Sequence, residues 1–171
     1  MKAGRCFRSE PAVIDPEALQ AIEESLDAGT VVVSETGDGL AQQLLDGRHR
    51  LLADEPVESG GGDAGPNPYE LILMALGACT SMTIRLYADR HKWPLEQVVV
   101  RLRHSRNHAQ DCVDCETKAT KLDRIDREIS LQGPLDADQR ARLLDIANSC
   151  PVHRTLESGV DITTRLAAVA G

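Results

Sequence analysis

Aromatic residues are scarce in this chain of 171 residues, since phenylalanine, tyrosine and tryptophan together make up only 2% of it. The core must therefore be aliphatic, and the stacking platforms on which single-stranded nucleic acids bind are missing. Positive charge is also in short supply, because 19 Lys and Arg face 27 Asp and Glu and leave a formal net charge of −8. A negative protein repels phosphate backbones and anionic lipid surfaces. We therefore expect neither nucleic acid nor a membrane among its partners.

Long apolar runs are absent as well. The longest, Leu71 to Ala78, is far shorter than the roughly 18 to 20 residues that span a bilayer. No apolar segment follows the first residues, as it would in a secretory signal. The number of cysteines, 5, is odd, which fits a reducing compartment better than a framework of disulfides. These absences favour a cytoplasmic protein.

Hydrophobic periodicity and turn residues predict the order of the elements. A loose arm and a short helix are expected over residues 1–29, before a main domain over residues 30–171. This domain begins with three antiparallel strands over residues 30–54, joined by glycine-containing turns. It continues with a long helix, two strands, a second long helix and a last strand, at residues 68–91, 98–107, 125–131, 136–150 and 160–166. Strands and helices do not alternate regularly, so the predicted fold class is α+β.

The first long helix carries apolar residues nearly all round its first half, which predicts burial on every side. The glycine-rich segment before it, residues 60–66, is expected to be a turn, because no Gly-Lys-Ser/Thr motif for phosphate follows it. Cys79 lies in the middle of this helix, and Cys150 lies on the apolar face of the second one. Two cysteines on two core-facing helices can meet.

Two interpretations of Cys79 and Cys150 remain open from their spacing. Cysteine is among the most often buried residues, so both can be plain core residues. His153 and Arg154 follow Cys150 by three and four residues, however, where a cation favours a thiolate. A thiolate attacks the O–O bond of a peroxide and becomes a sulfenic acid, which a second cysteine can convert to a disulfide.

Three motifs resemble the OsmC/Ohr family of osmotically inducible and organic hydroperoxide resistance proteins. They are Asn67-Pro68-x-Glu70-Leu71, Ala78-Cys79 in an apolar helix, and the run from Cys150 to Leu156, and the resemblance covers roughly residues 30–168. It implies an intertwined homodimer in which antiparallel sheets wrap two long central helices. It also implies a thiol peroxidase that reduces organic hydroperoxides with electrons from a dithiol and requires no cofactor. Cys79 would be the peroxidatic cysteine and Cys150 the resolving one, with supporting roles for Glu70 and Arg154.

The chain departs from the family pattern at two positions. The turn Gly37-Asp38-Gly39 lacks the arginine that the family usually places there, and Tyr69 stands where the family usually has glutamate. Glu70 lies nine residues before Cys79, about 180° around a straight helix, so it either caps the helix or the helix is irregular near Gly77.

The cation beside the thiolate is therefore expected from elsewhere. Arg48, Arg50 and Arg154 are candidates. Arg127 and Glu128 are interpreted as ordinary charges on the surface of a sheet.

A second cluster contains His104, His108, Cys112 and Cys115. Two histidines and two cysteines are a ligand set for a structural zinc ion. A dithiol that relays electrons and an inert loop are the alternatives. The cluster motivates a competing function, a non-catalytic protein of the same fold that binds a metal or a small apolar ligand. A third hypothesis is a domain kept for its stability or for a partner.

Overall fold

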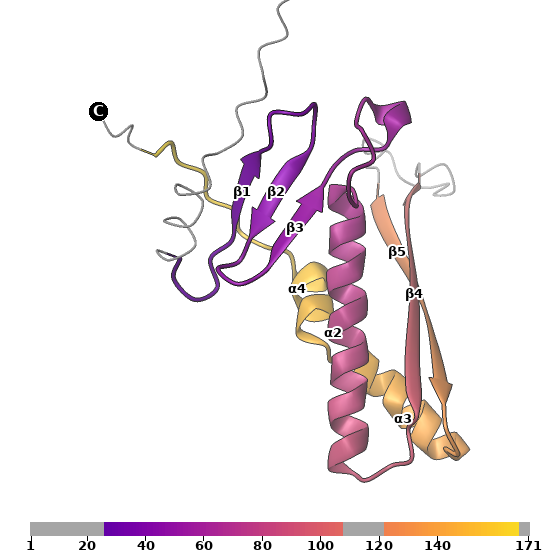
Figure 1. Cartoon of the computed structure of the whole chain (residues 1–171). Coiled ribbons are helices and arrows are strands. Elements are labelled where there is room, and N and C mark those ends of the chain that lie inside the picture. Colours follow the sequence, from indigo (N-terminus) through magenta and orange to yellow (C-terminus); the bar gives the residue numbers. More distant parts are fainter. Residues whose placement is uncertain (1–25, 108–121, 168–171) are drawn as a thin grey trace, which may run out of the picture. The chain divides into compact units, whose positions relative to one another are not determined.

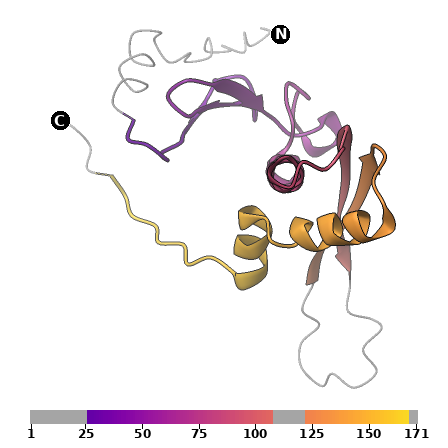
Figure 2. The ribbon, with the colours of Figure 1, turned by 90° about the horizontal axis from the view of Figure 1, so that it is seen from below.

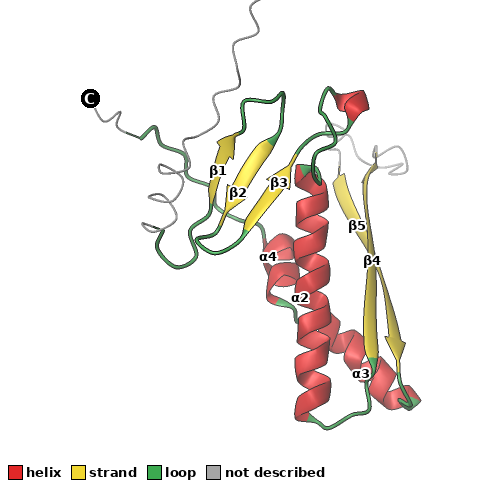
Figure 3. Ribbon diagram, in the orientation of Figure 1, coloured by secondary structure: helices red, strands yellow, loops and turns green. Residues whose placement is uncertain are grey.

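Figure 1 shows a computed structural model of the chain, which describes residues 26–107 and 122–167. The arm and helix expected over residues 1–29 lie almost entirely outside these ranges. The chain divides into two compact units between Leu71 and Ile72. Strands and helices follow one another without regular alternation, and both sheets are antiparallel (Figure 3). The predicted α+β class is confirmed.

The first unit contains the predicted three-stranded meander. Its strands are β1 (Val32–Glu35), β2 (Gln42–Leu45) and β3 (Arg50–Ala53), paired antiparallel in the order β1-β2-β3. Glycines at positive φ form the turns, with Gly39 at 57° between β1 and β2 and Gly47 at 89° between β2 and β3.

Asp54 organises the glycine-rich loop that follows the meander, beside the short helix η1 (Val57–Ser59). Its side chain is buried, and its carboxylate accepts backbone N–H groups from Glu55 at 2.8 Å, Gly62 at 2.8 Å and Ala64 at 3.2 Å. Gly61 packs so closely that a Cβ there would lie 1.8 Å from the carbonyl oxygen of Glu55. The segment is the turn that the sequence predicts, and the glycine is needed for close approach.

The first long helix is α2 (Pro68–Arg90), close to its predicted bounds. Asn67 and Glu70 form a capping box at its start. The Asn67 side chain accepts the N–H of Glu70 at 3.0 Å, and the Glu70 carboxylate accepts the N–H of Asn67 at 2.9 Å. Of the two alternatives for Glu70, the structure therefore shows the cap.

The second unit packs helices against a long hairpin. The strands β4 (Gln97–Asn107) and β5 (Leu122–Gln132) pair antiparallel and run alongside α2 (Figure 1). The helix α3 (Ala137–Ala147) begins at a capping box of Asp136 and Gln139. It crosses α2, since Figure 2 shows α2 end-on and α3 from the side. The core between these elements is aliphatic, as expected, and consists of Ile84, Ala88, Leu95, Leu135, Leu143 and Ala147.

Only one face of α2 is buried within the described residues. That face is a stripe of every fourth residue, formed by Leu76, Thr80, Ile84 and Ala88. The opposite stripe is apolar but exposed, with Met74 at 58%, Met82 at 64% and Leu86 at 67%. The prediction of burial on every side is wrong for the single chain, because the hairpin and α3 cover one side of the helix.

By length and composition, α2 could cross a membrane, with a mean hydropathy of 1.5 over 18 residues. The longest uninterrupted apolar run did not indicate this, because small polar residues divide the helix without lowering its average much. Core helices of globular proteins meet the same criterion. Arg85 of α2 donates hydrogen bonds to the carbonyl oxygens of Leu95 at 2.6 Å and Glu96 at 2.9 Å, and so ties the helix to the chain that leads into β4.

Two predictions near the C-terminus are wrong. The second long helix, predicted to include Cys150, ends earlier, because α3 ends at Ala147 and Cys150 is instead the N-cap of a separate helix, α4 (Pro151–Ser158). Residues 160–166 form no strand in the described part of the chain, and Ile162 and Leu166 are 81% and 95% exposed. Their alternating pattern is that of a strand, but in these parts of the chain no sheet edge pairs with them.

Candidate functional site: a hydrogen-bonded pair of cysteines

The structure brings Cys79 and Cys150 together although they are distant in the sequence. Cys79 is half-buried in the middle of α2, beside the buried stripe, and Cys150 is completely buried at the start of α4. The thiol of Cys79 donates a hydrogen bond to the sulfur of Cys150. Both are free thiols.

The N-terminus of α4 surrounds the sulfur of Cys150 with donors. The Sγ atom accepts the backbone N–H of His153 at 3.5 Å, and the N–H of Val152 also points to it. Burial raises the pKa of this thiol, but hydrogen bonds from Cys79, from the backbone of α4 and from the hydroxyl of Thr80 outweigh burial and hold the pKa below its ordinary value. A helix N-terminus favours a thiolate in this way.

Cys79 has the opposite tendency. Burial raises the pKa of its thiol, and so does the hydrogen bond that it donates to Cys150. The N–H of Val152 and the hydroxyl of Thr83 act against this rise and do not cancel it. The two thiols therefore differ, because the pKa of Cys79 is raised and the pKa of Cys150 is lowered.

Arg127 of β5 supplies the cation near this pair. Its Nη1 donates to the hydroxyl of Thr80 at 2.9 Å and to the carbonyl oxygen of Ala147 at 3.3 Å, and its Nη2 donates to the side-chain oxygen of Asn148 at 2.8 Å. The interpretation of Arg127 as a surface charge is wrong.

The strand pattern contained the signal for Arg127. Side chains alternate along a strand, so Arg127 shares a face with Ile125 and Ile129, which is the face turned to the helices. It also pairs across the hairpin with Leu102, a residue that packs against Gly77 of α2. In a half-buried strand, a charged residue at a position where the alternation predicts an apolar one indicates a functional role. The neighbouring residues in the sequence do not show this.

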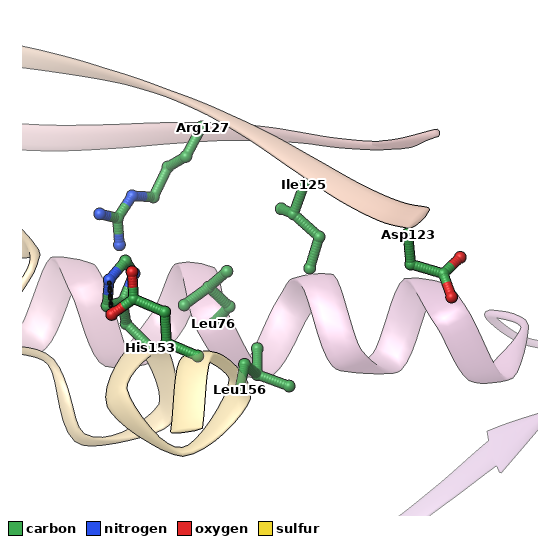
Figure 4. A pocket seen from close by; sticks show the side chains of 7 residues that line it. Leu76, Asp123, Ile125, Arg127, His153 and Leu156 are labelled. Carbon is green, nitrogen blue, oxygen red and sulfur yellow. Dashed lines mark ion pairs between the residues drawn. The ribbon is translucent and has the colours of Figure 1, made fainter. Parts of the chain in front are cut away.

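An open cavity of about 370 Å³ lies beside Arg127 (Figure 4). Arg127 points from β5 towards His153 of α4, and Leu76 of α2 lies to one side of them. His153 forms an ion pair with Glu157 at 3.3 Å. The lining is part apolar and part charged, and consists of Leu76, Asp123, Ile125, Arg127, His153, Leu156 and Glu157.

Glu70, Arg154, Arg48 and Arg50 are the other predicted site residues. Glu70 is in the cap of α2, and Arg154 is exposed on α4, where its backbone N–H donates to the carbonyl oxygen of Cys150 at 3.1 Å. Arg48 and Arg50 are exposed in the first unit.

Only His104 of the predicted zinc cluster lies among the described residues. His104 pairs with Asp123 at 2.9 Å, whereas His108, Cys112 and Cys115 lie outside the described residues. Among the residues that are described, no group of three or more His, Cys, Asp or Glu is placed to hold a metal ion. A zinc ion at the cluster stays a prediction.

The fold and the site define the class of this protein: an α+β domain with a hydrogen-bonded cysteine pair between a long helix and the start of another. The profile of the OsmC-like protein family matches residues 60–165, more than half of the chain. The chain therefore belongs to the OsmC-like protein family, and the resemblance inferred from its motifs is confirmed.

Solved structures show the same fold. An OsmC-like protein from Mycoplasma pneumoniae is 19% identical, with a TM-score of 0.58 over 78% of this chain and 89% of that one. An organic hydroperoxide resistance protein OsmC from Legionella pneumophila is 22% identical, with a TM-score of 0.55 over 76% and 89%. The organic hydroperoxide resistance protein OhrB of Bacillus subtilis is 16% identical, with a TM-score of 0.51 over 73% and 87%. A search of curated protein sequences gave no match.

Proposed function

We propose that the protein is a thiol-dependent peroxidase that reduces organic hydroperoxides to alcohols, as a defence against oxidative stress. The observation that carries this proposal is the hydrogen-bonded pair of Cys79 and Cys150 beside a cavity with Arg127. Two structural neighbours are named organic hydroperoxide resistance proteins. Fold alone does not establish an activity, so the proposal depends on the chemistry that this site supports.

Exposure and position indicate which cysteine attacks the peroxide and which forms the disulfide. Cys79 is the more accessible sulfur and attacks the outer oxygen of the hydroperoxide, which breaks the O–O bond, releases an alkoxide and leaves a sulfenic acid. Cys150, in contact with Cys79, then attacks that sulfur and forms a disulfide with loss of hydroxide. A dithiol reduces the disulfide and returns both thiols. The cycle needs a reducing compartment, which we take to be the cytoplasm.

The cavity lining suits an organic peroxide. Leu76, Ile125 and Leu156 offer apolar contacts for a carbon chain, and Arg127 and His153 offer donors for oxygen atoms. Glu70 supports the site by fixing the start of α2, and Arg154 adds a positive charge to the helix that carries Cys150.

We infer that a second copy of the chain covers the exposed face of α2. Met74, Met82 and Leu86 form an exposed apolar stripe there, and contiguous exposed apolar surface is typical of an interaction site. The strand-like residues 160–166, which pair with no strand in the described part of the chain, fit the edge of a partner's sheet. Met82→Glu should convert a dimer to a monomer in analytical ultracentrifugation.

The activity is tested by treating fully reduced protein with a slight excess of cumene hydroperoxide or hydrogen peroxide. We expect a rapid disulfide between Cys79 and Cys150 in the peptide map, reversed by dithiothreitol, with faster reaction of the organic peroxide. Cys79→Ser should abolish peroxide consumption, and Cys6→Ser should serve as the control that retains it. If Cys79→Ser consumes peroxide as fast as the parent protein, the peroxidase proposal is wrong.

A further inference from the structure

We propose that Cys150 is also a redox-sensitive cap of α4: in the reduced protein its sulfur holds the start of this helix, and the disulfide with Cys79 releases it. The inference rests on the proposed peroxidase function, from which the disulfide follows, and adds a regulation of the same site. It gives the oxidised protein a looser cavity wall, so that the product alcohol leaves and a dithiol reaches the disulfide.

The sulfur of Cys150 is the side-chain cap of α4. Its Sγ accepts the backbone N–H of His153 at 3.5 Å, and the backbone of Cys150 is non-helical, with φ −58° and ψ 130°, as is typical of an N-cap residue. Pro151 follows at the first position of the helix, where a missing N–H costs nothing. Sulfur is a weak acceptor, so the cap depends closely on the position of this one atom.

The helix α4 has few other contacts that hold it in place. It has only 8 residues, none of them is buried, and Val152 and His153 are half-buried. A helix of this length is not stable by itself in water, because nucleation costs more than a few hydrogen bonds return. An ion pair of His153 with Glu157 at 3.3 Å joins successive turns, but the Glu157 side chain is 75% exposed, and exposed pairs stabilise little. The cap therefore contributes a considerable part of the stability of α4.

Cys79, the partner of Cys150 in the disulfide, lies on a helix that is anchored more firmly. The helix α2 has 23 residues, and Thr80, next to Cys79, is completely buried and accepts a hydrogen bond from Arg127 at 2.9 Å. A covalent S–S bond brings two sulfur atoms closer than any contact between thiols does. Because α2 is fixed in the core, we expect the sulfur of Cys150 to move towards Cys79 and away from the N–H of His153.

A released cap changes the cavity, because α4 forms part of its wall. His153, Leu156 and Glu157 of this helix line the cavity together with Arg127 of β5 (Figure 4). Once the sulfur has moved, the N–H of His153 takes its acceptor from water, and the first turn of α4 frays. The two thiols have by then given two electrons and two protons to the hydroperoxide, which yields an alcohol and water. The wall therefore loosens only when the alcohol must leave and a reductant must enter.

The switch is tested by hydrogen–deuterium exchange of α4, measured by mass spectrometry in the reduced protein and after oxidation with diamide. Diamide takes two electrons and two protons from Cys79 and Cys150 and becomes a hydrazine, so the disulfide forms without any peroxide. We expect α4 to exchange about three- to tenfold faster in the oxidised protein, the range of a lost N-cap, while α3 keeps its protection. The melting temperature should not fall, because a cross-link stabilises the whole domain, and the faster exchange is then local.

Two substitutions at Cys150 separate the cap from the disulfide. Serine is a preferred N-cap and alanine is a poor one. Cys150→Ser should therefore protect α4 at least as well as the reduced parent, whereas Cys150→Ala should exchange as fast as the oxidised parent. Cys79→Ser treated with diamide is the matched control, because Cys150 then has no thiol partner on α2 and α4 should keep its protection.

Equal or slower exchange of α4 after oxidation overturns the switch even if the protein consumes peroxide, and so does a failure of diamide to join Cys79 and Cys150. Equal exchange in Cys150→Ser and Cys150→Ala overturns the role of the sulfur as a cap. Faster exchange after diamide in a protein that consumes no peroxide supports the switch and removes the peroxidase proposal instead.

Discussion

Among the described residues, each compact unit contains a charged side chain that turns inward and is held by neutral partners. In the first unit it is Asp54, which is 4% exposed and accepts three backbone N–H groups. In the second it is Arg127, which donates to a hydroxyl, a backbone carbonyl and a side-chain amide. Both avoid the cost of burying a charge without hydrogen bonds, but they do so with different kinds of partner.

The partners determine what each charge can do. The N–H groups around Asp54 come from the next ten residues of the chain, so the carboxylate closes a single loop. The acceptors of Arg127 come from α2 and from the end of α3, so this charge joins separate elements beside the cysteine pair. A charge satisfied by local backbone stabilises one loop, whereas a charge that joins separate elements beside a thiol can influence the reactivity of that thiol.

The largest expected effect comes from Arg127→Met. We expect the second-order rate constant for cumene hydroperoxide to fall by about ten- to a hundredfold, less than when a donor to the reacting atoms is removed. The pH–rate profile should move to higher pH, which simple loosening of the fold would not cause. Arg124→Met, on the exposed face of the same strand, should retain the parent rate and profile. Equal losses of the rate constant in Arg127→Met and Arg124→Met would contradict a specific role for the inward charge.

Asp54→Asn should have the next largest effect, on stability alone. Asparagine presents one oxygen and an NH₂ group, so at least one of the three N–H donors loses its acceptor and meets another donor. We expect a lower melting temperature and a rate constant, per folded molecule, equal to that of the parent. Glu58→Gln, an exposed change in the same loop, should leave both unchanged. A rate that falls while the melting temperature holds would give Asp54 a functional role and remove the contrast with Arg127.

Local patterns predicted most of the fold. The turn glycines predicted the meander, and Asn67 and Pro68 predicted the start of α2. These features depend on residues within one turn or one hairpin. The failures are non-local: the exposed stripe of α2 and the unpaired residues 160–166 depend on what covers them, and their periodicity reports only that they are apolar.

The candidate site divides in the same way. The two cysteines could be selected from the sequence because the thiol itself is the reactive group. The alternation of β5 could identify Arg127 as a charge that turns inward, but the partners of Arg127 and the position of Thr80 depend on hydrogen bonds between β5, α2 and the end of α3 that no spacing encodes. Cys150 was placed on the wrong element for a local reason, since the helix ended before it and Pro151 began another.

Acid unfolding offers the smallest but most selective contrast. Hydrogen bonds from Ala64, Gly62 and Glu55 outweigh burial and hold the pKa of Asp54 below its ordinary value. A carboxyl with a depressed pKa in the folded state adds stability above its unfolded pKa, about 3.9, and loses that stability as the pH falls through the folded value. Urea titrations from neutral pH to below pH 3 should therefore show a steeper acid decline in the parent than in Asp54→Asn. Arg127→Met should keep the parent's slope, because a guanidinium stays protonated throughout this range. A slope unchanged in Asp54→Asn would mean that the loop has opened before the carboxyl takes up its proton.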